Sequence, residues 1–119
     1  MPSFIHDYLR THRRKWAITQ KELAFLLGHK SPTHISRLEL GQRIPSKDVV
    51  LACEVLFGIP PRSCFPKLYA NIEETVLARA ATLYERLDNE MSKTAIRKKE
   101  FLSAALKRAI TRNNKTEGV

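Results

Sequence analysis

A short segment between Gly28 and Gly41 carries polar side chains that its apolar pattern does not explain. Ile35 and Leu38, with Leu40 as a further candidate, are spaced to pack on one side of a short helix. Four polar side chains of the segment have no evident packing role: Thr33, His34, Ser36 and Arg37. Hydroxyl, imidazole and guanidinium groups can hydrogen bond to a partner, and arginine can do so with two parallel N–H groups. The segment is therefore a candidate binding surface.

No group of residues typical of an enzyme accompanies this segment. The carboxylates are dispersed along the chain, the serines lack a histidine and aspartate to activate them, and no glycine-rich phosphate loop is present. The two cysteines, Cys53 and Cys64, form no CxxC motif, and a structural zinc ion would need four ligands. We expect both to be buried, reduced thiols. The sequence predicts a binding protein without a catalytic residue, a metal or a cofactor.

The net charge of +9, from 21 basic and 12 acidic residues, favours a polyanionic partner, and nucleic acid before a membrane surface. The charge is unevenly spread, because residues 1–69 and 92–119 are net basic whereas residues 70–91 are net acidic. No apolar run is long enough to cross a bilayer, and the N-terminus lacks the pattern of a secretory signal. We therefore expect a cytoplasmic protein with no membrane segment.

Five short helices, predicted between residues 3 and 68, surround the candidate segment. The first covers residues 3–16, where side chains recur at helical spacing: Ile5, Leu9, His12 and Trp16, with Phe4 and Tyr8 beside them. Thr19 and Glu22 form a capping box that opens the second helix. Gly28 ends it, because glycine adopts the left-handed conformation at little cost.

The candidate segment itself forms the third predicted helix. Ser31 caps it, Pro32 is its first residue, and Gly41 ends it. Ser46 caps a fourth helix that stops at Gly58, with an apolar face formed by residues such as Val50, Cys53 and Phe57. The prolines that follow permit one more short turn.

The last fifty residues have a different composition, with no proline and no glycine before Gly118. One apolar face of a long helix is predicted from residues that step by four and three: Ile72, Val76, Ala80, Leu83, Leu87 and Met91. A second long helix is marked by Ile96, Leu102, Ala105, Leu106, Ala109 and Ile110. The sequence thus predicts an all-α fold with a five-helix domain at 1–69, a helical pair at 70–112 and a polar tail at 113–119. The two helices of the pair are expected to pack together or on the first domain, and to mediate dimerisation.

Four motifs occur in order in the first half: TQKELA, an I-S-R-L-E-x-G run, GQRIPS and FGIP. From about Arg13 to Phe65 the chain resembles the helix-turn-helix domain of the lambda-repressor and Cro type. The resemblance implies an ion pair between Arg13 and Glu39 that ties the first helix to the third. It also places Cys53 and Cys64 at core positions, and it implies that the inner faces of the second and third helices contain Leu23, Ala24, Leu27, Ile35 and Leu38.

The resemblance also implies which residues would contact DNA. In such domains the third helix, residues 32–40 here, enters the major groove with its first residues on the base edges. These would be Thr33, Arg37 and His34, and Arg37 is the strongest candidate because its planar fork can bind guanine with two hydrogen bonds. The DNA backbone would be contacted by Gln20, Lys30, Ser31, Gln42 and Arg43. The chain departs from the family in three places: the segment between Gly28 and Gly41 is one residue longer than usual, Ala17 replaces a frequent glycine, and Glu54 stands where the family often has alanine.

Two functions follow as expectations. The first is a sequence-specific DNA-binding transcriptional regulator, a homodimeric repressor or autoregulator that binds double-stranded DNA. The alternative is an antitoxin-like or other partner-binding protein that holds a protein through residues 70–112. The basic helix over residues 93–112 could also contact flanking phosphates. Phe25 is expected to face outward, where either the C-terminal helices or a second copy would cover it.

Overall fold

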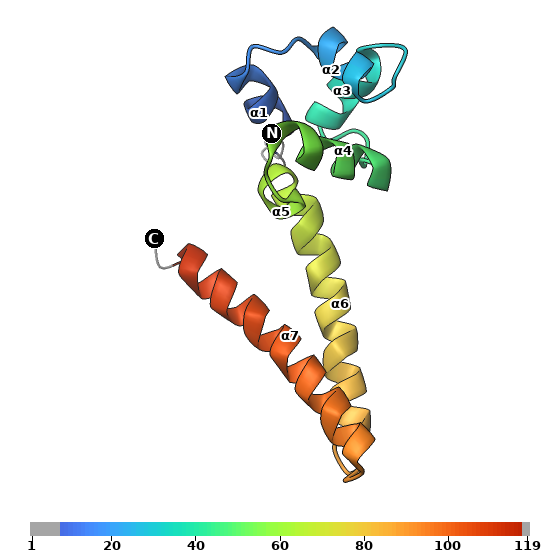
Figure 1. Ribbon diagram of the computed structural model, residues 1–119, viewed down its shortest axis with the longest axis vertical. Coiled ribbons are helices and arrows are strands. Elements are labelled where there is room, and N and C mark those ends of the chain that lie inside the picture. Colours follow the sequence, from blue (N-terminus) through green and yellow to red (C-terminus); the bar gives the residue numbers. More distant parts are fainter. Residues whose placement is uncertain (1–7, 118–119) are drawn as a thin grey trace. The chain divides into compact units, whose positions relative to one another are not determined.

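The computed structural model describes residues 8–117, and the side chains of residues 8–114 (Figure 1). All regular structure in this range is helical, which confirms the predicted all-α fold. The predictions for Phe4 and Ile5 lie outside the described residues. The chain divides into two compact units, Met1–Asn71 and Ile72–Val119. Each unit has its own cluster of buried apolar side chains.

Five short helices make up most of the first unit, and the start of a sixth, longer helix follows them. They are α1 (Leu9–Lys15), α2 (Gln20–Leu26), α3 (Thr33–Glu39), α4 (Lys47–Phe57) and α5 (Pro61–Cys64). The predicted capping box is present, since the Thr19 hydroxyl accepts from Glu22 N–H at 3.0 Å and Thr19 N–H donates to Glu22 Oε1 at 2.9 Å. Ser46 caps α4 by accepting from Val49 N–H at 3.3 Å, and Gly58 ends this helix with φ of 69°.

The start of α3 differs from the prediction by one residue. Pro32, not Ser31, occupies the cap position, and the helix begins at Thr33. Pro32 already has helical dihedral angles, with φ of −67° and ψ of −14°. Ser31 still accepts a hydrogen bond from Thr33 N–H at 3.1 Å. Its hydroxyl therefore satisfies one of the free N–H groups at the start of α3, although the helix begins one residue later.

The core of the first unit joins all five short helices. Leu23, Ala24, Ile35 and Leu38 are buried, as predicted for the inner faces of α2 and α3, and Leu27 is partly buried against them. The remaining fully or nearly fully buried apolar residues are Leu9, Val49, Cys53, Cys64 and Phe65. Both cysteines are free thiols, as predicted. A hydrogen bond with Cys64 lowers the pKa of the Cys53 thiol, an effect that burial opposes, so the two sulfur atoms are neighbours in the core.

Ala17 has φ of 58°, in the left-handed region that favours glycine. This conformation costs an L-residue about 1–2 kcal/mol. Glycine relieves this strain but also gives the unfolded chain more conformational entropy, which offsets part of the gain. Ala17→Gly is therefore expected to raise the free energy of unfolding by about 1 kcal/mol at most. Urea unfolding followed by the fluorescence of Trp16, the single tryptophan, measures this change. Ala52→Gly inside α4 is the matched control and is expected to lower stability by a similar amount; equal losses for both variants would contradict the strain at Ala17.

The second unit contains most of α6 (Pro66–Arg86) and all of α7 (Lys93–Glu117), joined by a short turn. Ala80 and Leu87 pack with Ala95 and Leu102 near this turn, and Tyr84 lies against them. Figure 1 shows the two helices closest at the turn and farther apart toward the other end. There Glu73 and Arg112 form an ion pair. The helix α7 continues through residues 113–117, where a polar tail is predicted, because no glycine or proline interrupts it.

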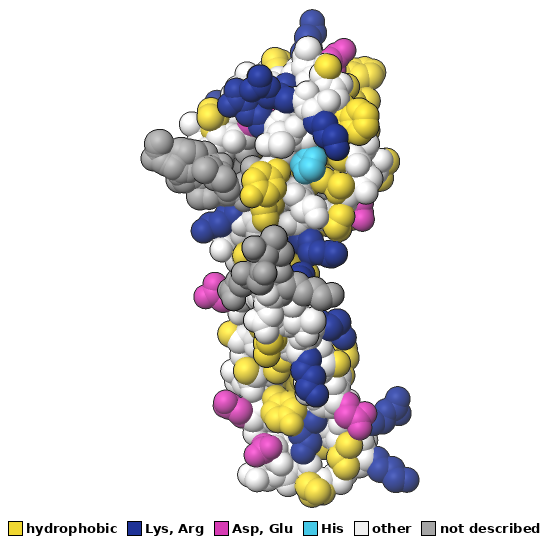
Figure 2. Space-filling view, turned by 90° about the vertical axis from the view of Figure 1, so that its left-hand side faces the viewer, with side chains coloured by type: hydrophobic (Ala, Val, Ile, Leu, Met, Phe, Trp, Pro, Cys, Tyr) yellow, Lys and Arg dark blue, Asp and Glu magenta, His cyan; other side chains and the backbone are white. Residues whose placement is uncertain are grey.

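The predicted apolar face of the first long helix is only partly covered. Ala80 and Leu87 are buried, but exposed fractions of about half or more remain at four other predicted positions: Ile72 (55%), Val76 (52%), Leu83 (42%) and Met91 (77%). When two helices pack along one narrow seam, only the side chains that face the other helix are buried, and the side chains beside the seam remain exposed to solvent. Within this unit the buried and half-buried positions of α6 are Glu73, Leu77, Ala80, Ala81 and Tyr84, and Leu87 is buried just after the helix ends. Apolar side chains are accordingly visible on the surface of this unit, between charged ones (Figure 2).

Candidate nucleic-acid interface

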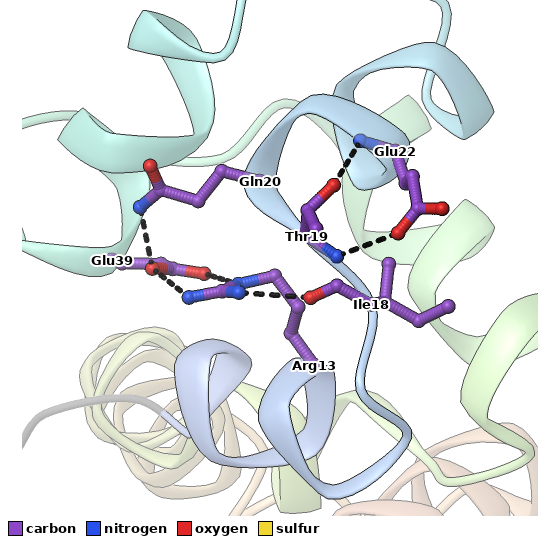
Figure 3. A network of polar contacts seen from close by, with 6 residues as sticks. All are labelled: Arg13, Ile18, Thr19, Gln20, Glu22 and Glu39. Atoms are coloured by element: carbon purple, nitrogen blue, oxygen red, sulfur yellow. Dashed lines mark hydrogen bonds and ion pairs between the residues drawn. The ribbon is translucent and has the colours of Figure 1, made fainter.

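A network of ionic hydrogen bonds joins the first three helices (Figure 3). Arg13 of α1 donates from Nε to Glu39 Oε2 at 2.6 Å and from Nη2 to Glu39 Oε1 at 3.1 Å. Its third contact is from Nη1 to the carbonyl oxygen of Ile18 at 2.9 Å. The side chains of Arg13 and Glu39 are only 11% and 3% exposed. This pair therefore holds the end of α3 against α1 in a water-poor environment, where its hydrogen bonds are strong.

Gln20 belongs to the same network, although the resemblance implies only a DNA contact for it. Its Nε2 donates to Glu39 Oε1 at 3.0 Å, so the first residue of α2 is tied to the last residue of α3. The amide nitrogen has a second N–H group that this bond does not use. At the same helix start, hydrogen bonds from the backbone and then the side chain of Thr19 hold the pKa of Glu22 below its usual value. The start of α2 is thus tied to α3 by the bond from Gln20 to Glu39 and is capped internally by Thr19 and Glu22.

The helix α3 has one inward and one outward face. Ile35 and Leu38 are buried in the core, whereas Thr33 and Arg37 are exposed on the opposite side, one turn apart. Leu40, a candidate for inward packing, is 55% exposed, because the helix has ended at Glu39 and the chain turns at Gly41. The outward face therefore presents a hydroxyl and a guanidinium group to solvent.

Ser36 shares this outward face and is half-buried. Sequence reasoning left it without a role, although its position three residues after Thr33 and next to Arg37 is a sufficient signal. The outward face of α3 is therefore formed by Thr33, Ser36 and Arg37, with Leu40 exposed just after the helix ends.

His34 points sideways from α3 and stacks on His29, with 3.8 Å between the ring centroids. Burial lowers its pKa first, and the charges of His29, Arg43 and Arg37 lower it further. In the free protein these effects favour the neutral form of His34, which can hydrogen bond or stack without charge. The repulsion also shows that Arg37 and Arg43 lie on the same side of the unit as this histidine pair.

The turn residues flank α3 on both sides. Lys30 and Ser31 are exposed before it, and Ser31 donates to the Thr33 hydroxyl at 3.1 Å. Gln42 and Arg43 are exposed after it, and Gln42 N–H donates to the carbonyl oxygen of Arg37 at 2.9 Å. The structure thus brings these four residues to the two ends of the helix whose outward face carries Arg37.

This arrangement offers hydrogen-bond donors and positive charge to a bound partner. Within the described residues no group of three or more histidine, cysteine or acidic side chains could hold a metal ion. No helix among them is both long and apolar enough to span a membrane.

Comparison with known protein families gives a match that covers the same helices. Residues 9–63 match the family model described as helix-turn-helix. No curated protein and no solved structure matches the chain significantly. The matched range begins with α1 and ends within α5, so it contains the ionic network and both faces of α3. Residues 9–63 therefore form a helix-turn-helix domain, which is similar to the domains of the lambda-repressor and Cro type in DNA-binding transcription regulators.

Proposed function

We propose that the protein is a homodimeric transcriptional repressor or autoregulator that acts in the cytoplasm by occupying its operator. The observation that carries this proposal is the outward face of α3, where Thr33 and Arg37 are exposed while Ile35, Leu38 and Glu39 hold the helix in place. A helix fixed in this way can enter the major groove without reorganising.

The proposed contacts divide into two groups. Base edges would be read by Thr33 and Arg37 and by His34 as a neutral group. The DNA backbone would be contacted from both ends of the reading helix by Gln20, Lys30, Ser31, Gln42 and Arg43. Phosphate contacts supply affinity that falls with salt, and base contacts supply specificity. The free second N–H of Gln20 supports a backbone contact that does not break its bond to Glu39.

A homodimer would place two copies of α3 in successive major grooves. Two-fold symmetric operators match dimers whose reading helices lie about one helical turn, roughly 34 Å, apart. Selection from a random duplex library at moderate salt tests the whole proposal. We expect an enriched motif with two inverted halves, and light scattering should give twice the mass of one chain. An absence of any enriched motif would refute sequence-specific binding, and a single half-site bound by a monomer would refute the dimer.

Arg37→Ala and Arg43→Ala are expected to act differently on the selected site. Arg37→Ala should lose about 1–3 kcal/mol of discrimination at one base position, because a bidentate contact to guanine is lost. Arg43→Ala should weaken binding to all sequences alike and reduce the slope of log K against log salt concentration by about one. Gel shifts on the selected site and its single-base variants at several salt concentrations measure both effects. If both variants lose affinity equally on every sequence, this division of contacts is wrong.

A further inference from the structure

The seam between α6 and α7 divides the second unit into two sides. The seam is formed by Ala80 and Tyr84 on α6, by Leu87 just after the end of α6, and by Ala95, Lys99 and Leu102 on α7, each series stepping by four and three residues. Tyr84 and Lys99 occupy equivalent half-buried positions of the two helices. Because the helices run antiparallel, the residue that precedes each of them in the sequence lies on the same side of the seam. These positions are Leu83 and Lys98. The side that they define also carries Arg79 and Arg86 on α6 and Phe101 on α7, one turn away.

This side combines open apolar surface with positive charge. Phe101 is 69% exposed, Val76 52% and Leu83 42%. Leu83 lies in a shallow hollow of about 410 Å³ whose other lining residues include Arg79 and Arg86. Neither arginine, nor Lys98, forms an ion pair with any residue in the described part of the chain. We call the surface formed by Val76, Arg79, Leu83, Arg86, Lys98 and Phe101 the basic-apolar face.

The other side of the hairpin has a different charge. By the same helical spacing, it holds four acidic residues (Glu74, Glu85, Asp88 and Glu100) and two basic ones (Lys93 and Lys107). A hollow on that side is lined by Tyr84, Ile96 and Ser103, with Glu100 and Lys107 at its edge. By contrast, neither helix places an acidic residue on the basic-apolar face between residues 72 and 112. The two sides therefore differ in net sign, and each has exposed apolar side chains.

We propose that the basic-apolar face binds an acidic amphipathic helix of another protein. A helix whose apolar stripe covers Leu83 and Phe101 would place flanking carboxylates beside Arg79, Arg86 and Lys98, as in helix-in-groove recognition. A two-fold contact of this face with itself would instead bring like charges together, which is costly. Nucleic acid would match the charge but would leave the aliphatic and aromatic side chains exposed to water. This surface is separate from α3, so the inference does not depend on the proposed operator binding.

Selection of helical peptides against the full chain tests this inference. The library displays helices of about five turns built from alanine, leucine, glutamate, lysine and glutamine, so that charge is free to vary. We expect the enriched peptides to carry leucine at helical spacing flanked by glutamate, and their affinity, measured by fluorescence anisotropy, to fall with added salt. Enrichment of neutral or lysine-rich helices, or of none, would overturn the inference.

Two matched pairs of variants locate the peptide. Arg79→Glu with Arg86→Glu should weaken an enriched peptide about tenfold or more, whereas Lys93→Glu with Lys107→Glu, the same charge change on the other side, should leave its affinity within about twofold. Phe101→Ala should weaken it and Ile110→Ala should not. Circular dichroism first verifies that each variant retains its helix content. Equal losses in the paired variants would overturn the assignment to this face.

Two further measurements exclude other occupants. The wild-type chain and the Arg79→Glu, Arg86→Glu variant are compared for binding to vesicles of phosphatidylcholine with phosphatidylglycerol and to the selected DNA. We expect both proteins to bind the selected DNA with the same affinity and neither protein to bind the vesicles. A loss of vesicle or DNA binding in this variant would assign the face to a membrane or to flanking phosphates, and would overturn the proposed protein partner. Loss of operator binding in the Arg37 and Arg43 variants alone would leave the inference intact.

Discussion

Glu39→Ala is expected to lower the free energy of unfolding of the first unit by about 3–5 kcal/mol, the cost of leaving a buried charge without its partner. Glu39 accepts three hydrogen bonds, two from Arg13 and one from Gln20, and its side chain is 3% exposed. Removing it leaves the Arg13 guanidinium in the same water-poor position with only the Ile18 carbonyl oxygen as a partner. Urea unfolding followed by Trp16 fluorescence measures the loss, because Trp16 lies in this unit.

The exposed ion pair between Lys47 and Asp48 is the matched control. Its side chains are 86% and 84% exposed, and the shortest N–O distance is 3.2 Å. Asp48→Ala is therefore expected to cost less than about 1 kcal/mol. A Glu39→Ala loss as small as the Asp48→Ala loss would show that water screens the Arg13 pair, and that the network does not hold α3 in place.

Ile35→Ala is the second large effect, with an expected loss of about 2–5 kcal/mol of unfolding free energy. Ile35 is fully buried on the inward face of α3, so its truncation removes apolar contacts and leaves a cavity that the short helices cannot fill. Ile35→Val, which removes one methylene group, should cost about 0.5–1.5 kcal/mol. The same urea titration measures both variants.

Comparison with Arg37→Ala separates the two faces of α3. Arg37 is exposed, so its truncation should change stability by no more than about 0.5 kcal/mol while it alters base discrimination. Ile35→Ala should weaken binding to every DNA sequence at temperatures where the unit begins to unfold, with base preference unchanged in the folded fraction. Altered base preference in Ile35→Ala at low temperature would mean that the core residue also sets the position of the reading side chains.

The caps and the α2–α3 core of the helix-turn-helix unit were predictable from the sequence because their signals are local. Thr19 and Glu22 satisfy each other's backbone and side-chain groups within one turn, and Gly58 ends α4 by its own dihedral angle. Ala17 was likewise identifiable as a departure, and its positive φ is the structural consequence. The start of α3 was misplaced by one residue because Pro32 is compatible both with a cap and with a first helical position.

The sequence could predict which side of α3 faces outward but not the geometry of the candidate site, and which of its side chains contact DNA stays a prediction. Thr33 and Arg37 follow from their spacing relative to Ile35 and Leu38. The sequence could not show that Gln20 bonds to Glu39, or that His34 stacks on His29, because both contacts join side chains from different segments. Ser36 was omitted although its spacing pointed to the same face as Thr33.

The sequence by itself determined the capping box of Thr19 and Glu22, the cap at Ser46, the glycine that ends α4, and which residues form the core of α2 and α3, because caps, glycine turns and helical periodicity act within a few residues. It placed the start of α3 one residue too early and the end of the last helix several residues too early. The tertiary structure alone decided which apolar residues of α6 are covered and which remain open. Ile72, Val76 and Leu83 share the periodicity of Ala80 and Leu87, yet only the latter two are buried. The sequence pattern shows which side chains are apolar and which side of their own helix they occupy. Whether such a side chain is buried depends on where a second helix packs. The stripe of α6 that α7 covers is narrower than the predicted apolar face.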